Sequence, residues 1–240
     1  MPERAQVEQG SVTGQNNGHW LLACLRGRLR PHPLGELSMH LLASHLEGNT
    51  ALPSYLGLYR IEYNQWLSQH FRPAPGIQLI ENLARAAGSL DSVQRSHWRA
   101  KVRHELLLGR KEEFESLYQL LLNSIAGQDP AYEAQWAKIV AAGCLGSRHL
   151  WQDLGLRSRE DLSSLLSYVF PELVRANDQD MRWKRFFYRR LCEEGGDYVC
   201  RSPSCEDCPS YSLCFVGHEN SHGQLEHVEQ EPASLRGVKG

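Results

Sequence analysis

Residues 34–48, LGELSMHLLASHLEG, carry the clearest helical pattern of the chain. The leucines recur every three or four positions, a spacing that places side chains on one face of an α-helix. They are Leu34, Leu37, Leu41, Leu42 and Leu46. Gly48 follows, and glycine is common just after the end of a helix. The stretch therefore predicts an amphipathic helix whose leucine face is buried in a core.

The same periodicity continues on both sides of this stretch. It predicts further helices over residues 19–30, 52–71, 77–87, 90–126, 131–142, 158–170 and 180–194. Pro31 stops the first of these helices, Gly143 ends the helix over 131–142, and Ser158 caps the one that follows. The apolar positions expected over 52–71 are Leu58, Ile61, Trp66 and Phe71. Because alternation with period two nowhere persists, the sequence predicts an all-α fold with a single helical domain.

Composition predicts how this domain is bounded. Residues 1–18 are polar and are expected to be disordered, residues 19–195 form the helical domain, residues 196–217 form a cysteine-rich loop, and residues 218–240 form a flexible polar tail. The start, MPERAQVEQG, does not resemble a signal peptide, and no apolar run is long enough to span a bilayer. We therefore expect a cytoplasmic protein without a membrane partner. A formal net charge of −2 argues against a general nucleic-acid binder.

The stretch CRSPSCEDCPSYSLCF brings four cysteines together near the end of the chain. They are Cys200, Cys205, Cys208 and Cys214, with the spacing C-x4-C-x2-C-x5-C. Prolines at 203 and 209 disfavour a helix here, so the segment is expected to be a loop. Thiolates are soft ligands that select iron–sulfur clusters, zinc or copper(I). Four of them this close in sequence can converge on one metal centre.

The spacing leaves two kinds of metal centre open. Structural zinc sites usually combine two C-x2-C pairs with a longer spacer, whereas this motif has one such pair with single cysteines on either side. Uneven spacing over one loop suits an iron–sulfur cubane better, because its iron corners are spread apart. Disulfides are disfavoured by the expected cytoplasmic location. The motif thus favours an iron–sulfur cluster, with structural zinc as the alternative.

The predicted helix over 180–194 combines an apolar face with five cations directly before the cysteine loop. The apolar residues, expected to face the core, are Trp183, Phe186, Phe187 and Leu191. The cations are Arg182, Lys184, Arg185, Arg189 and Arg190. One interpretation is a solvated basic face. The other is that cations such as Arg185, Arg189 and Arg190 stabilise a negative cluster and attract an oxyanion or an acidic partner.

Three stretches together resemble the NifQ family of nitrogen-fixation proteins. They are HLWQDLGL at 149–156, NDQDMRWKRFFYRRLCE at 177–193, and the C-x4-C-x2-C-x5-C motif. The resemblance implies a carrier that holds molybdenum in a molybdenum–iron–sulfur cluster of the Mo-3Fe-4S type, or in its iron–sulfur precursor. The implied partners are molybdate, or another molybdenum source, and the proteins that assemble the nitrogenase iron–molybdenum cofactor. The family's ligand motif falls on Cys200, Cys205, Cys208 and Cys214.

Three further residues are candidates for additional metal ligands or supporting contacts. His149 begins the first of these stretches and is expected at the start of a short helix or turn, where it either bonds to Asp153 or backbone or binds incoming molybdenum. His218 lies just past the motif. Cys192 stands eight positions before Cys200, and packing is the simpler interpretation of its thiol.

Two other classes of protein remain as alternatives. One is a zinc-stapled helical interaction protein. The other is an iron–sulfur DNA-repair glycosylase, whose cluster loop is similar but has a six-residue first gap, where this chain has four. Phosphate-cradling G-x4-G-K-[ST], HExxH and nucleophile-elbow motifs are all missing from the sequence. We therefore expect a carrier and not an enzyme.

Overall fold

The computed structural model of this chain describes residues 16–72 and 90–193. In this part the ordered elements are helices, with one isolated bridge between Leu29 and Phe71 and no strands. The helices are α1 (Asn16–Arg26), α2 (Gly35–Leu46), the short 3-10 helix η1 (Ser54–Gly57), α3 (Arg60–His70), α5 (Leu90–Gly109), α6 (Lys111–Leu122), α7 (Pro130–Cys144), α8 (Leu150–Leu154), α9 (Arg159–Val169), α10 (Pro171–Ala176) and α11 (Trp183–Glu193). The all-α prediction is confirmed for the described residues.

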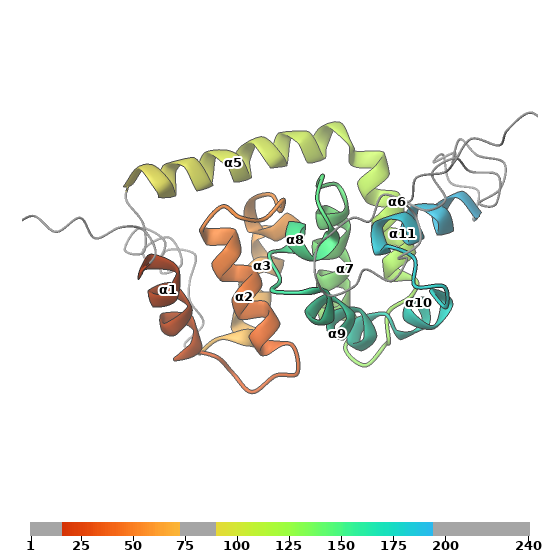
Figure 1. The fold of residues 1–240 in the computed structure, drawn as a ribbon, viewed down its shortest axis with the longest axis horizontal. Coiled ribbons are helices and arrows are strands. Elements are labelled where there is room, and N and C mark those ends of the chain that lie inside the picture. Colours follow the sequence, from red (N-terminus) through yellow and green to blue (C-terminus); the bar gives the residue numbers. More distant parts are fainter. Residues whose placement is uncertain (1–15, 73–89, 194–240) are drawn as a thin grey trace, which may run out of the picture.

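Helix α7 lies at the centre of the fold, between α2 and α3 on one side and α6 and α11 on the other, with α5 running along one edge (Figure 1). Its sequence is apolar nearly all round, which is the pattern of a helix surrounded by others. Trp136, Ile139 and Val140 are fully buried. Pro130 occupies its first turn, and the Asp129 carboxylate accepts the Tyr132 N–H at 3.2 Å. The core of the fold is therefore assembled around α7.

Gly143 does not end this helix, contrary to the sequence prediction, because α7 continues to Cys144. A Cβ atom at Gly143 would lie 2.7 Å from Cδ2 of Leu154. The glycine therefore lets α8 pack closely against α7. Its role lies in tertiary packing, which a reading of local stop signals does not detect.

The segment predicted as one helix over 90–126 is two helices, α5 and α6, that meet at Arg110. Arg110 has φ −120° and ψ 33°, outside the helical region. Its guanidinium bonds to the Glu113 carboxylate at 2.5 and 2.6 Å and to the Leu145 carbonyl at 2.8 Å. The bend thus brings the start of α6 against the end of α7.

Most of the expected core positions are buried. On α2, Leu37, Leu41 and Leu42 all face the core. Ser158 caps α9, with its Oγ accepting the Asp161 N–H at 3.4 Å. Ile61 is the exception, since 73% of its surface is exposed. Its predicted placement in the core was therefore wrong.

Some predictions concern residues outside the described part of the chain. These are the helix over 77–87, residues 1–15 of the segment expected to be disordered, the cysteine-rich loop over 196–217 and the tail over 218–240. Residues 16–18 were wrongly placed in that disordered segment, because they form the start of α1. The domain boundaries accordingly stay predictions. Within residues 16–72 and 90–193, no helix combines the length and apolarity needed to cross a bilayer.

His70 is a buried polar residue at the contact between α2, α3 and α7. Its Nε2 lies 3.1 Å from Ser38 Oγ and 3.2 Å from Tyr132 Oη, and its ring packs on Trp66 with centroids 4.7 Å apart. Burial, and secondarily the nearby His32, lower the pKa of His70 to about 3. The native protein therefore holds this imidazole neutral.

His70 should make the fold sensitive to acid. Because the pKa is about 3 in the folded state and about 6.5 in the unfolded state, only the unfolded chain takes up this proton as pH falls below about 6.5. We expect this residue to remove about 2 kcal/mol of unfolding free energy between pH 7 and pH 5. His70→Gln should make urea denaturation less pH-dependent by this amount. An unchanged pH dependence in the variant would contradict the assignment.

Candidate functional site

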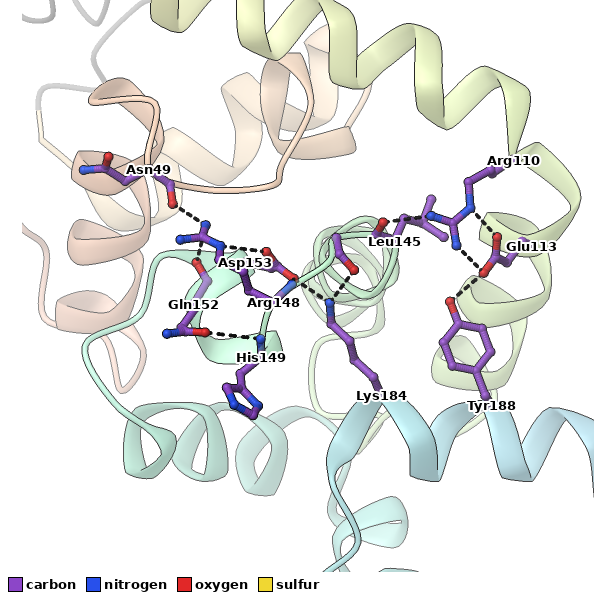
Figure 2. Close-up of polar contacts among 11 residues, drawn as sticks. Asn49, Arg110, Glu113, Leu145, Arg148, His149, Gln152, Asp153, Lys184 and Tyr188 are labelled. Atoms are coloured by element: carbon purple, nitrogen blue, oxygen red, sulfur yellow. Dashed lines mark hydrogen bonds and ion pairs between the residues drawn. The ribbon is translucent and has the colours of Figure 1, made fainter. Parts of the chain in front are cut away.

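Asp153 is a buried carboxylate that lies between two of the stretches singled out in the sequence. It belongs to α8, and 1% of its surface is exposed. Its side chain accepts hydrogen bonds from Lys184 Nζ of α11 at 2.5 Å and from Arg148 Nε and the Arg148 N–H at 3.3 and 3.0 Å (Figure 2). A buried carboxylate requires such partners, because desolvation of an unpaired charge is costly.

The two side chains that bind Asp153 also donate hydrogen bonds to backbone carbonyls of neighbouring segments. Lys184 Nζ also donates to the Gly146 carbonyl at 2.8 Å, and Arg148 Nη2 donates to the Asn49 carbonyl at 2.7 Å. The Asp153 carbonyl in turn accepts the Ala51 N–H at 2.8 Å. One ion-pair cluster around a buried carboxylate therefore joins the segment after α2, the connection between α7 and α8, and α11. We call Asp153, Arg148 and Lys184 the Asp153 cluster.

Gly146 leaves room for this cluster. A Cβ atom there would lie 2.4 Å from Oδ2 of Asp153 and 2.7 Å from the Cβ of Ala51. Any side chain would displace the carboxylate or the segment after α2. Glycine is therefore required here by close packing.

Helix α11 has a second attachment, on α6. Tyr188 Oη donates to Glu113 Oε1 at 2.6 Å, and the same carboxylate pairs with Arg110. The predicted apolar face is confirmed, because Phe186, Phe187 and Leu191 are buried. Trp183 is half-buried and packs on both phenylalanine rings, with centroids 5.7 Å from each. Two polar contacts and an apolar face thus fix the helix that precedes the cysteine motif.

The cysteine motif itself lies outside the described residues. This applies to Cys200, Cys205, Cys208 and Cys214, and also to His218. Helix α11 ends at Glu193, seven positions before Cys200. Cys192 is half-buried in the last turn of this helix. Among the residues that the structure does describe, no group of three or more His, Cys, Asp or Glu side chains is arranged to hold a metal ion.

The cations of α11 have different surroundings. Lys184 belongs to the Asp153 cluster, while Arg189 and Arg190 pair with Glu193 at 2.8 and 3.3 Å. Arg185 is exposed and lines a cavity. The predicted anion-attracting set of Arg185, Arg189 and Arg190 is therefore divided, and Glu193 offsets part of its charge.

The cavity beside Arg185 has a volume of about 820 Å³, and we call it the His149 cavity. It is formed by the segment 147–152, the first half of α9 and the start of α11. Its cationic lining consists of Arg148, Arg159, Arg182, Lys184 and Arg185. The acidic residues in the lining are Glu160 and Asp180. The cavity brings together two residues that the sequence had suggested separately, His149 and Arg185.

His149 precedes α8, as predicted, and its backbone N–H bonds to Gln152 Oε1 at 3.3 Å. The sequence predicts a ring that bonds to Asp153 or backbone, or that binds incoming molybdenum, and of these the bond to Asp153 is not the arrangement found. The carboxylate contacts Arg148 and Lys184, and the ring points away from it towards α9 (Figure 2). The ring therefore lies where it can contact a molecule in the His149 cavity.

Lys184 and Asp153 are the residues whose pairing sequence reasoning missed. The signal was present in part, because Lys184 stands three and seven positions before Phe187 and Leu191, on the same helical face. A lysine on a buried face needs a buried partner. Nothing in the local pattern indicated that the partner was Asp153, 31 positions earlier.

The fold and this site define an all-α protein whose last described helix is fixed by an ion pair to a buried carboxylate and precedes a cysteine-rich stretch of sequence. The sequence model of the NifQ family matches residues 37–216, which include the Asp153 cluster and all four motif cysteines. The chain belongs to the NifQ family.

Relatives align over much of the chain. Protein NifQ of Azotobacter vinelandii is 46% identical over 176 residues, which cover 73% of this chain and 84% of that protein. Protein NifQ of Klebsiella pneumoniae is 44% identical over 118 residues, which cover 49% of this chain and 68% of that protein. No solved structure matches the chain.

The Asp153 cluster should contribute strongly to stability. Asp153→Asn preserves the shape of the side chain but leaves Lys184, which is itself largely buried, without its counter-charge. We expect a loss of about 3 kcal/mol in the free energy of unfolding, measured by urea denaturation. The matched control is Glu172→Gln, which breaks the exposed pair with Arg175 and should cost less than about 0.5 kcal/mol. Equal effects of the two substitutions would contradict this role.

Proposed function

We propose that this protein carries molybdenum in a molybdenum–iron–sulfur cluster and delivers it for assembly of the nitrogenase iron–molybdenum cofactor. The observation that carries the proposal is the extent of the family match, which includes the whole C-x4-C-x2-C-x5-C motif. The motif supplies four thiolates, the ligands typical of iron–sulfur centres. Cys200, Cys205, Cys208 and Cys214 are the proposed cluster ligands.

Ligand chemistry supports a donor role. In a cluster with one molybdenum and three irons, three cysteines complete the coordination of the irons. Molybdenum usually takes about six donors, and neither the cluster sulfides nor the remaining cysteine supplies them all. Molybdenum is then held less completely by protein than iron is. Such a centre suits a carrier that gives up one metal, and His149, His218 and Cys192 are proposed as residues that support it.

The placement of α11 supports a role for its cations. A cluster bound to four thiolates carries net negative charge, and exposed cations nearby lower the cost of holding it. Arg185 is exposed, and Arg189 and Arg190 lie towards the end of the helix that leads to the motif. We propose that these three arginines offset the charge of the cluster and guide an acidic acceptor protein.

Replacement of a motif cysteine should remove the cluster and leave the fold intact. Cys205→Ser or Cys208→Ser is expected to lose most of the bound iron, since serine is a poor ligand for these metals. Because the described residues form an extensive buried core upstream of the motif, between Leu21 and Leu191, the helical circular dichroism should stay nearly unchanged. Iron and molybdenum are measured by elemental analysis after anaerobic purification.

The control for this experiment is Cys24→Ser, which removes a half-buried thiol of α1 outside the motif and should keep its iron. Full iron retention in the motif variants would refute the ligand assignment. A colourless wild-type protein that contains zinc in place of iron would instead support the structural-zinc alternative.

Delivery should be stoichiometric, because no catalytic motif is proposed and the molybdenum is incompletely held. The protein is loaded with isotopically labelled molybdenum and incubated with cofactor-assembly proteins in the absence of free molybdate. Label should enter the nascent cofactor in an amount no greater than the amount loaded, as the donor loses it. Many rounds of insertion from free molybdate, with the donor keeping its own label, would identify a catalyst instead.

A further inference from the structure

A second cavity, of about 560 Å³, lies under α5 and shares Ser147 and Arg148 with the His149 cavity. It is enclosed by the second half of α5, the segment 48–53 after α2, and the connection from α7 to α8. We call it the Arg103 cavity. It contains none of the residues proposed above as cluster ligands.

The lining of the Arg103 cavity is strongly basic. Its charged residues are Arg99, Arg103, Arg110, Arg148 and Asp153, which give a formal charge of +3. The cavity is therefore positive although the whole chain carries a formal net charge of −2. Concentrated positive charge in a concave surface raises the local concentration of anions.

Some of the charged residues that line the Arg103 cavity have a partner of opposite charge in direct contact, and others do not. Arg110 is paired with Glu113, while Asp153 is shared between Arg148 and Lys184. Arg99 and Arg103 therefore remain as two cations that no carboxylate of the cavity offsets through a direct contact.

Arg103 is more than a solvated surface residue. It is half-buried, and its Nη1 is buried without a hydrogen-bond partner in the described part of the chain. Burial lowers the pKa of Arg103, and the positive charges of Arg99 and Arg148 lower it further, while the charge of Asp153 opposes this in part. Buried donors are nearly always paired in native proteins, so an unpaired guanidinium nitrogen among like charges indicates a site for a negatively charged acceptor.

We propose that the Arg103 cavity binds a small doubly charged oxyanion between Arg99, Arg103 and Arg148. Two cations without a contacting carboxylate match a dianion in charge, and the planar fork of guanidinium donors matches oxyanion geometry. Tetrahedral dianions such as molybdate and sulfate share this chemistry. The anion that the site serves is molybdate, and this assignment rests on the function proposed above.

A molybdate site at this position would bind the free oxyanion at a place different from the proposed cluster. Free molybdate is held by charge and hydrogen bonds, whereas molybdenum in the cluster is held by sulfur. The Asp153 cluster lies between the two cavities, and its Arg148 lines both. The Arg103 cavity therefore supplies the protein with its metal in the oxidised, soluble form, before any reduction or sulfur ligation.

Calorimetric titration of the full chain with sodium molybdate at low salt tests the site. Arg99→Gln and Arg103→Gln should each weaken binding by about tenfold, since each removes a charged donor. Because the Arg99 side chain is exposed, Arg99→Gln should fold normally and tests the site even if Arg103→Gln misfolds. Circular dichroism checks the folding of both variants. The control is Arg175→Gln, an exposed arginine outside both cavities, which should bind as the wild type does. Unchanged binding in both cavity variants would overturn the site.

Parallel titrations with sodium sulfate and sodium phosphate identify the anion. Weaker binding of both supports molybdate as the ligand of the site. Equal binding of sulfate overturns the molybdate assignment and supports a general oxyanion site.

The Cys205→Ser variant distinguishes this inference from the function on which it rests. It should lose the cluster and still bind molybdate at the Arg103 cavity. Loss of molybdate binding in this folded variant would place the anion at the cysteine segment and overturn the inference. If the wild type forms no molybdenum cluster but its molybdate affinity depends on Arg103, the proposed carrier function fails and the anion site stands.

Discussion

The buried carboxylate of Asp153 is the constraint on which the arrangement of the site depends. Its oxygens and carbonyl bind groups from the segment after α2, the connection before α8, and α11. A charge in this position is tolerated only with its partners in place, because desolvation costs several kcal/mol for an unpaired ion. The two cavities are consequently built around the same cluster, and Arg148 is common to it and to both of them.

The position of α11 follows from this constraint and from apolar packing together. Lys184 fixes its beginning, Tyr188 fixes its middle through Glu113, and Phe187 and Leu191 bury the face between these contacts. A helix anchored in this way ends at a defined place on the surface. The position of Glu193, the last described residue of this helix, is therefore set by contacts inside the helical fold.

Charge is distributed very unevenly over this slightly acidic chain. Arginines and lysines gather where the connection between α7 and α8 meets α5, α9 and α11. Surface cations elsewhere, such as Arg26 and Arg175, have exposed carboxylate partners and add little to stability. This local excess of positive charge distinguishes the two cavities from the rest of the described surface.

Local sequence determined most of the helices, because leucine spacing and caps such as Ser158 act within a few residues. It did not determine all of their bounds, since α1 ends at Arg26 and the helix predicted over 52–71 is divided into η1 and α3. It also determined the four-cysteine motif, whose ligand chemistry follows from residue type. Only tertiary structure decided that Ile61 is exposed, that Gly143 serves packing, and that the helix predicted over 90–126 bends at Arg110. The same holds for Asp153 with Lys184, and for Arg103 near Arg148. The members of each pair are distant in sequence, and they lie close together only because the helices pack in this arrangement, which a linear pattern does not encode.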